Sequence, residues 1–240
     1  MKSVAPPSAN GREPYCAVVF DFDGVLIESG NIKTEAFLEL FAGHPEQREA
    51  IRAYHLQNVG VSRYVKFEYI VRHLLGLPFD EGTRERLGAA FSELVQHKVV
   101  ACAFVPGARE MLEFLRGRCR LFVASGTPHA ELEGIVEARG LAPYFDGVWG
   151  TPHSKAEIAQ AIAAEQGLHG GEVLMVGDGL ADYQAAQAAG IGFLARITDE
   201  NRELWSTLPV TGVRDLHEMR TWWEQQRREK NTESDHDQRG

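Results

Sequence analysis

Cysteine, positive charge and long apolar runs are all scarce in this sequence, and each scarcity excludes a class of protein. The three cysteines, Cys16, Cys102 and Cys119, show no C-x-x-C spacing, so we expect reduced thiols rather than a disulfide scaffold. The 25 basic residues are outnumbered by 34 acidic ones, which argues against a nucleic-acid or anionic-membrane partner. No apolar run approaches the length of a membrane span. We therefore expect a cytoplasmic protein, either a monomer or a homodimer.

The composition changes along the 240 residues, which are enough for one core with an inserted subdomain. Residues 1–16 are polar and proline-rich, which predicts a flexible leader. Apolar residues recur at helical spacing through residues 30–103, which predicts an insertion of about four helices. Residues 17–29 and 104–226 would form the core around this insertion. Residues 227–240 are charged and almost free of apolar side chains, which predicts a disordered tail.

Short apolar runs alternate with helical patterns inside the core segments. This alternation predicts an α/β fold, a doubly wound parallel sheet with helices on both faces. The expected strands begin at Ala17 and cover Leu121–Ser125, Gly147–Gly150, Val173–Asp178 and Ile191–Ala195. The expected helices cover Ala108–Leu115, Lys155–Glu165, Ala181–Ala189 and Leu216–Gln226, with one more that is capped by Thr127 and begins at Pro128.

The stretch from Ala17 to Leu26 joins an apolar strand to two carboxylates, Asp21 and Asp23. Alternation along an extended chain places both on the same side, and Gly24 then lets the backbone turn. Like charges at the end of a buried strand are costly unless a cation or hydrogen-bond donors compensate them. Asp21 and Asp23 are therefore candidates for chemistry, although a lone Asp-x-Asp-Gly is also a common turn.

Further polar residues are predicted at the same edge of the sheet. The functional crevice of an open parallel sheet lies beyond the carboxyl ends of its strands. Ser125 and Gly126 follow one expected strand and Asp178 ends another. Asp182 lies one helical turn beyond Asp178 and can return toward the crevice. Lys155 opens a helix at the same level, where it opposes the helix dipole, and this favours an anionic partner for it.

At these residues the sequence resembles the haloacid dehalogenase-like hydrolase superfamily. The matching segments follow the family's order and are Asp21–Leu26, Ser125–Thr127, Lys155 and Gly177–Asp182. The helical insertion resembles the cap of the phosphoglycolate phosphatase and β-phosphoglucomutase branch. The resemblance covers roughly residues 17–196, and it implies a Rossmann-like core with an inserted all-helical cap.

The resemblance implies a phosphatase that works through an aspartyl phosphate. Asp21 would be the nucleophile, and Asp23 would protonate the leaving oxygen and then activate water. Ser125 and the amide of Gly126 would hold phosphate oxygens. Lys155 would balance charge on the transferring group, although it is followed by Ala156 where family members often have proline.

The same resemblance implies that Mg²⁺ is the cofactor. Asp21, Asp178 and the main-chain carbonyl of Asp23 would hold the ion, with Asp182 as an outer or occasional direct partner. The cation would neutralise the carboxylates, so that an anionic nucleophile can approach an anionic phosphate.

Three cations of the insertion are candidates for substrate recognition. Arg63 and Lys66 follow Gly60 in a segment that resembles the specificity loop of such caps, and they would contact a hydroxyl or a second acidic group as the cap closes. The alternative is a helix start capped by Ser62, with both cations solvated. Lys33 lies where mutase-like relatives often carry a histidine, which weakens the mutase interpretation.

The favoured function is Mg²⁺-dependent hydrolysis of a small phosphorylated metabolite, such as a sugar phosphate or a phosphoglycolate-like acid. Dehalogenases lack the residue at Asp23, so its presence argues for phosphoryl transfer. A phosphosugar mutase, which passes the phosphoryl group to a substrate hydroxyl, is the first alternative. A non-catalytic binding or regulatory protein is the second, and the intact Asp21, Asp23, Lys155 and Asp178 argue against it.

Overall fold

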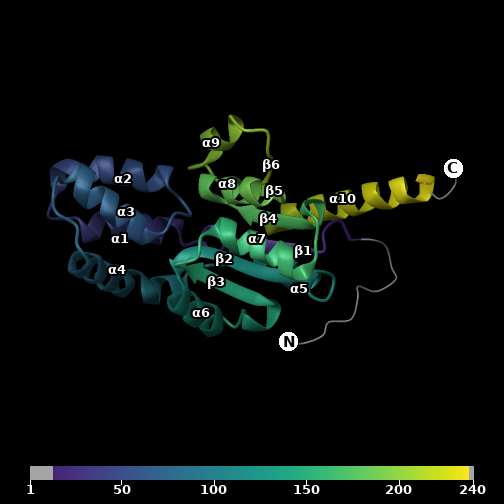
Figure 1. Ribbon diagram of the computed structural model, residues 1–240, viewed down its shortest axis with the longest axis horizontal. Coiled ribbons are helices and arrows are strands. Elements are labelled where there is room, and N and C mark those ends of the chain that lie inside the picture. The colour runs from purple at the N-terminus through teal and green to yellow at the C-terminus, as the bar shows by residue number, and fades with distance from the viewer. Residues whose placement is uncertain (1–12, 238–240) are drawn as a thin grey trace.

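A computed structural model describes residues 13–237, with side chains described as far as residue 232. Figure 1 shows a sheet flanked by helices and, beside it, a separate lobe of helices. Within the described chain the sheet has six parallel strands in the order β3-β2-β1-β4-β5-β6. The strands are β1 Ala17–Phe20, β2 Arg120–Pro128, β3 Gly147–Thr151, β4 Val173–Gly177, β5 Gly192–Arg196 and β6 Thr211–Val213.

Helices cover both faces of the sheet. Alternate residues of the central strand β1 face opposite sides and pack against different helices. Val18 and Phe20 of β1 pack in a cluster with α5, α6 and α10, and Ala17 and Val19 pack in a second cluster with α7 and α8. Burial on both faces explains why the strand is a continuous apolar run. The predicted doubly wound α/β fold is confirmed. These helices are α5 Ala108–Leu115, α6 His129–Ala138, α7 Lys155–Gln166, α8 Leu180–Ala189 and α10 Leu216–Asp237.

The second lobe is the helical insertion between β1 and α5. Within the described residues it contains four α-helices, a 3₁₀ turn and a π-helical turn. Its core is aromatic: the rings of Phe37, Phe67 and Phe91 lie with centroids 4.8, 5.5 and 5.7 Å apart. The elements are α1 Gly30–Leu40, the 3₁₀ turn Pro45–Gln47, α2 Arg48–Gln57, α3 Arg63–Tyr69, the π turn Ile70–Leu74 and α4 Glu81–Ala101.

Two connecting segments join the lobes and run side by side. Backbone hydrogen bonds of 2.9 and 3.1 Å link residues 26–28 to residues 103–105. Arg139, the residue directly after α6, donates to the carbonyls of Val99, Val100 and Cys102, so a core side chain holds the end of α4. The hinge between the lobes is therefore narrow and anchored on the core side.

The C-terminal segment differs from the sequence prediction. Residues 227–240 were predicted to be disordered, whereas α10 continues through Asp237, and residues 238–240 lie outside the described range. The helix is supported by an exposed ion pair between Arg220 and Glu224 at 3.2 Å. Lys230 also donates to the carbonyl of Pro14 at 2.6 Å. A helix with little apolar surface thus gains its contacts from the other end of the chain.

The predicted flexible leader is described only in its last residues, since residues 1–12 lie outside the described range. Residues 13–16 are packed rather than flexible. Glu13 accepts a hydrogen bond from the indole of Trp223 at 3.0 Å, and the ring of Tyr15 stacks on Trp222 at 6.1 Å. The tryptophans of α10 therefore fix this part of the leader.

Element boundaries differ in a few other places. β2 runs through to Pro128 and α6 begins at His129, so Thr127 is not the helix cap that the sequence predicted. Ser154 and Glu157 do form the predicted capping box at the start of α7. The strand β6 and the short helix α9 Arg202–Ser206 were not predicted. No helix among the described residues combines the length and apolarity that a membrane span needs.

Candidate active site

The carboxyl ends of three neighbouring strands bring the predicted site residues together. Phe20 of β1 is in register with Val123 of β2 and Val176 of β4, so the residues that follow meet at one edge. The helical lobe covers this edge and closes a pocket over it. The predicted residues that line the pocket are Asp21, Asp23, Lys33, Arg63, Lys66, Ser125, Gly126 and Asp178.

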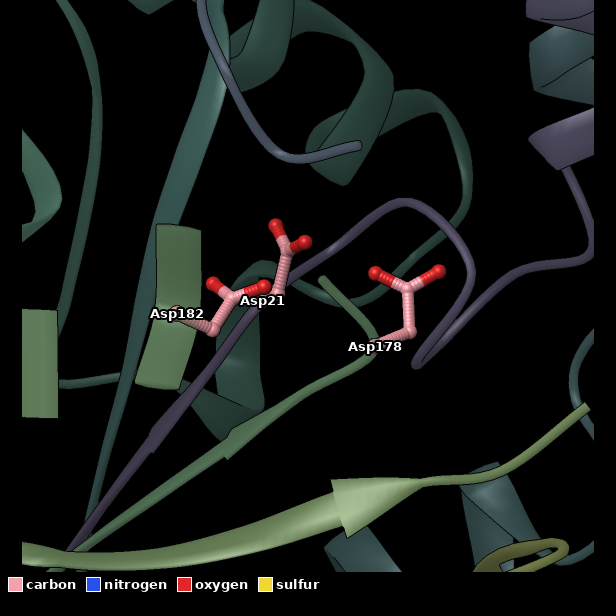
Figure 2. A group of neighbouring side chains, drawn as sticks. All are labelled: Asp21, Asp178 and Asp182. Carbon is pink, nitrogen blue, oxygen red and sulfur yellow. The ribbon is translucent and has the colours of Figure 1, made fainter. Parts of the chain in front are cut away.

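Asp21, Asp178 and Asp182 form a carboxylate cluster (Figure 2), and Asp21 and Asp178 of this cluster line the pocket. One oxygen of each lies within 4.8 Å of the others, although Asp21 directly follows β1, Asp178 lies in the loop after β4 and Asp182 lies in the first turn of α8. A Cβ at Gly24 would lie 2.0 Å from Asp178, and φ at Gly24 is +76°, so only glycine permits this approach. Oδ1 of Asp178 is buried with no hydrogen-bond partner among the described residues.

Lys155 is embedded in the same cluster. Its Nζ lies 2.9 Å from Asp21 and 2.6 Å from Asp182. Burial alone lowers the pKa of Lys155, but the charges of Asp182 and Asp21 outweigh burial and raise its pKa above the usual value. The second oxygen of Asp182 accepts from the amide of Gly179 at 3.1 Å. Both oxygens of Asp182 are thus engaged, and its clearest role is to hold Lys155 against Asp21.

The cluster carries more negative charge than Lys155 balances. Burial raises the pKa of Asp21 to about 7, with the charges of Asp182 and Asp23 adding to burial and Lys155 opposing it. Burial, Asp21 and Asp182 raise the pKa of Asp178 well above its usual range. A divalent cation would remove this cost, and carboxylate oxygens are ligands that Mg²⁺ prefers. The donor set, with its unpartnered oxygen on Asp178, fits the predicted metal.

Asp23 faces away from the cluster, toward β2 and the helical lobe. Its carboxylate accepts from Ser29 at 2.7 Å and from Thr127 at 3.0 Å, and it forms a short ion pair with Lys33 of α1. Burial alone would raise the pKa of Asp23, but Lys33 and these hydrogen bonds lower it to about 2. Asp23 is therefore an anion in this conformation, able to accept a proton but not to donate one.

The helical lobe is closed onto the site. The loop between α2 and α3 passes over the cluster: a Cβ at Gly60 would lie 3.0 Å from Nζ of Lys155 and 3.3 Å from Asp182. Gly60 has φ of +81°, so its conformation and its close approach both require glycine. The backbone of the helical lobe at Gly60 therefore lies close to the buried lysine of the core.

Comparison with known proteins agrees with this geometry. The family model of haloacid dehalogenase-like hydrolases matches residues 15–190. The chain belongs to the haloacid dehalogenase-like hydrolase family. The helical lobe is therefore described as its cap from here on, and the resemblance predicted from the motifs is confirmed.

Individual relatives are similar over most of the chain. It is 30% identical over 190 residues to the probable phosphatase IndB of Dickeya dadantii, covering 72% of this chain and 77% of that protein. It is 27% identical over 208 residues to a phosphoglycolate phosphatase of Rhodospirillum rubrum, covering 83% and 86%. A hydrolase of the same superfamily from Geobacter sulfurreducens shares the fold with a TM-score of 0.61 at 21% identity, covering 90% and 99%.

The cap cations are buried, so the alternative of two solvated side chains at the start of α3 is wrong. Ser62 makes no side-chain capping bond there. Arg63 is 4% exposed and donates to both oxygens of Glu131 in α6, at 2.7 and 2.9 Å. It also donates to Ser92 of α4 at 2.9 Å. Arg63 therefore ties the cap to the core. Lys66, which is equally buried, has no such partner among the described residues.

Two residues that sequence reasoning missed support the site. The amide of Asn201, in the loop after β5, donates to the carbonyls of Asp178 and Arg196, both at 2.9 Å. It fixes the main chain that carries Asp178. Thr127 holds Asp23 through its hydroxyl. An asparagine in a polar loop gives no signal in a single sequence. The sequence pattern predicted Thr127 as a helix cap and gave no sign of its contact with Asp23.

Proposed function

We propose that this protein is a Mg²⁺-dependent phosphatase that hydrolyses a small phosphomonoester through an aspartyl phosphate. The observation that carries the proposal is the position of Asp21, paired with Lys155 inside a cluster of acids at the floor of a closed pocket. The phosphatase names of the relatives from D. dadantii and R. rubrum support it. The intact acids and lysine argue against a binding protein without turnover.

The residues fit a metal as follows. Asp21 and Asp178 would hold Mg²⁺ with the main-chain carbonyl of Asp23, and the unpartnered oxygen of Asp178 is available for this purpose. When bound, the ion would neutralise the acids and polarise the phosphate. Asp182 would act through Lys155, since both of its oxygens are already engaged.

Asp21 is held in place for attack on phosphorus. One of its oxygens accepts from the amide of Phe22 at 2.7 Å, and the other contacts Lys155. Attack would form an Asp21–phosphorus bond as the ester oxygen leaves, and water would then cleave the acyl phosphate. The hydroxyl of Ser125, the amide of Gly126 and Lys155 would bind the phosphoryl oxygens.

Asp23 would manage the protons of both steps. As an anion it can take a proton from the attacking water. To protonate the leaving oxygen it must first bind a proton, so its contact with Lys33 has to loosen when substrate enters. Lys33 therefore couples the position of the cap to the protonation of Asp23.

A panel of phosphorylated metabolites tests the proposed function. We expect phosphate release that requires Mg²⁺ and disappears with EDTA. If the folded, Mg²⁺-loaded protein releases phosphate from none of the compounds, the proposed phosphatase activity is ruled out. A hexose 1-phosphate, assayed with the corresponding bisphosphate, is included to detect a mutase, which would give an isomerised sugar phosphate instead of free phosphate.

Lys33→Met is expected to raise the pKa of Asp23, because the charge and hydrogen bond that lower it are removed. Dephosphorylation needs ionised Asp23, so the rate falls below this pKa. The acid limb of the kcat profile should therefore move up by about one pH unit or more. Lys98→Met, at an exposed position of α4, is the matched control. An acid limb that stays in place would mean that Lys33 does not govern Asp23.

A further inference from the structure

Arg196, the last residue of β5, is a buried cation that the steps described above leave without a role. A buried guanidinium needs partners for its charge and for its donors. Both oxygens of Glu28 accept from it, at 2.6 and 3.1 Å. It also donates to the carbonyl of Gly24 at 3.0 Å and to the carbonyl of Arg214 at 3.2 Å. The side chain thus joins the end of β5 to the turn that follows β1.

The turn that Arg196 holds is part of the candidate metal site. It begins at Asp23, whose main-chain carbonyl is an expected metal ligand. Gly24 follows directly and lies against Asp178, since a Cβ at Gly24 would be 2.0 Å from that carboxylate. Glycine loses more conformational freedom on folding than any other residue, so a hydrogen bond from outside the turn helps to keep it in one conformation.

The main chain of Arg196 is linked to the second segment of the metal site. The side-chain amide of Asn201 donates to the carbonyl of Arg196 and to that of Asp178, both at 2.9 Å. Oδ1 of Asn201 accepts from the amide of Thr198 at 2.7 Å, so the asparagine is itself held in place. One arginine therefore connects both segments: its side chain reaches the turn after β1, and its carbonyl is tied through Asn201 to the loop after β4.

We propose that Arg196 is a positioning residue for the metal site, and that it fixes the turn carrying Asp23 relative to the loop carrying Asp178. The inference rests on the metal requirement of the proposed function and adds to it a residue that touches neither metal nor substrate. Mg²⁺ demands near-ideal octahedral geometry, so errors in the position of its ligands weaken binding. Arg196 therefore governs the affinity for the metal more than the chemistry that follows metal binding.

Two other roles of Arg196 make different predictions. The first is electrostatic: burial and the other acids of the cluster raise the pKa of Asp178, and the charge of Arg196 opposes them. A lysine at the same position would preserve such a role. The second is purely structural, in which the ion pair with Glu28 stabilises the fold. Loss of that role would lower the melting temperature without any change in metal affinity.

Thermal unfolding at increasing Mg²⁺ concentrations tests the proposal, because the rise in melting temperature gives the Kd of the ion. In Arg196→Met this Kd should rise about tenfold to 100-fold, as is typical when an outer partner of a metal site is lost. Arg196→Lys retains the charge but offers one nitrogen in place of three, and should raise the Kd about tenfold. Wild-type affinity in either variant would overturn the proposal.

Two further variants separate the contacts of the arginine. Glu28→Gln removes the ion pair but leaves the carbonyl of Gly24 as a partner, so the Kd for Mg²⁺ should rise by less than about threefold. A rise as large as in Arg196→Met would assign the effect to the ion pair instead of the turn and would overturn the proposal. Arg202→Met, at an exposed position shortly after β5, is the matched control and should keep the wild-type affinity.

The Mg²⁺ dependence of phosphate release is a second readout. In Arg196→Met the Mg²⁺ concentration for half-maximal rate should rise with the Kd, whereas kcat at saturating Mg²⁺ should fall less than about threefold. A lower kcat with an unchanged Mg²⁺ requirement would overturn the proposal.

The unfolding measurement needs no turnover, so it separates this proposal from the phosphatase. A weaker affinity for Mg²⁺ in the Arg196 variants would support the positioning role even if no ester were hydrolysed. Unchanged affinity in these variants would overturn it even in an active phosphatase. A wild type whose melting temperature does not respond to Mg²⁺ would overturn both the positioning role and the metal requirement.

Discussion

Asp21→Asn is expected to lower kcat by at least about 10⁴-fold, because an amide cannot serve as the phosphoryl acceptor. The substitution is nearly isosteric, and the amide oxygen can still accept from the amide of Phe22. The variant should therefore fold and bind substrate. Phosphate release at saturating substrate and Mg²⁺ measures the loss, and Glu200→Gln, an exposed position at the pocket rim, is the control. Retention of a tenth of the activity would exclude Asp21 as the nucleophile.

The same variant has a consequence for stability that depends on pH. The pKa of Asp21 is raised to about 7 in the folded protein, from an ordinary value near 4. Between about pH 4 and pH 7, Asp21 therefore holds a proton in the folded state but loses it in the unfolded state. The contribution of Asp21 to stability is consequently lost as pH rises from about 4 to 7. Without metal, Asp21→Asn should be the more stable protein above pH 7, by about 2 kcal/mol or more, and should match the wild type near pH 4.

Thermal unfolding in EDTA at several pH values measures this difference. Addition of Mg²⁺ should reduce the difference in stability between Asp21→Asn and the wild type, because the ion stabilises only the wild type, which retains the Asp21 carboxylate. A difference in melting temperature that does not change with pH would contradict the raised pKa of Asp21. The loss of activity and the gain in stability would together show that the Asp21 carboxylate lowers the stability of the protein and is required for the reaction.

The sequence was sufficient for the sheet and for most of the floor of the site. Apolar runs that end in Asp21, Ser125 and Asp178 predict buried parallel strands, and parallel strands bring their carboxyl ends to one edge. The capping box at Ser154 placed Lys155 at the same level. These features depend on local periodicity and on a topological rule, both of which one sequence carries.

Contacts between distant segments could not be predicted in the same way. The ion pair of Arg63 with Glu131 and that of Lys33 with Asp23 depend on how the cap closes on the core, which no local pattern specifies. The extension of α10 depends on packing against residues 13–15 at the other end of the chain. A polar segment has no periodicity of its own that reveals such support, so its composition predicted disorder.

Lys155→Met is expected to damage both activity and stability, because it removes the ammonium that Asp21 and Asp182 share. Loss of a preorganised cation at the transferring group should lower kcat about 10³-fold. Breaking a buried pair from one side leaves uncompensated carboxylates, which should lower the free energy of unfolding by about 3 kcal/mol near pH 8. Methionine retains the length and apolar contacts of the lysine stem, so the losses of activity and stability would arise from removal of the charge.

The pH dependence of this loss separates a charge effect from a packing effect. At pH 5 Asp21, whose pKa is raised to about 7, binds a proton in the folded state and has less need of Lys155. Denaturant unfolding in EDTA should therefore show a smaller loss at pH 5 than at pH 8, whereas Lys98→Met should show none at either pH. An equal loss at both pH values would mean that Lys155 acts by packing alone. A loss that grows with pH, and that Mg²⁺ partly reverses, would show that the lysine and the metal compensate the same buried acids.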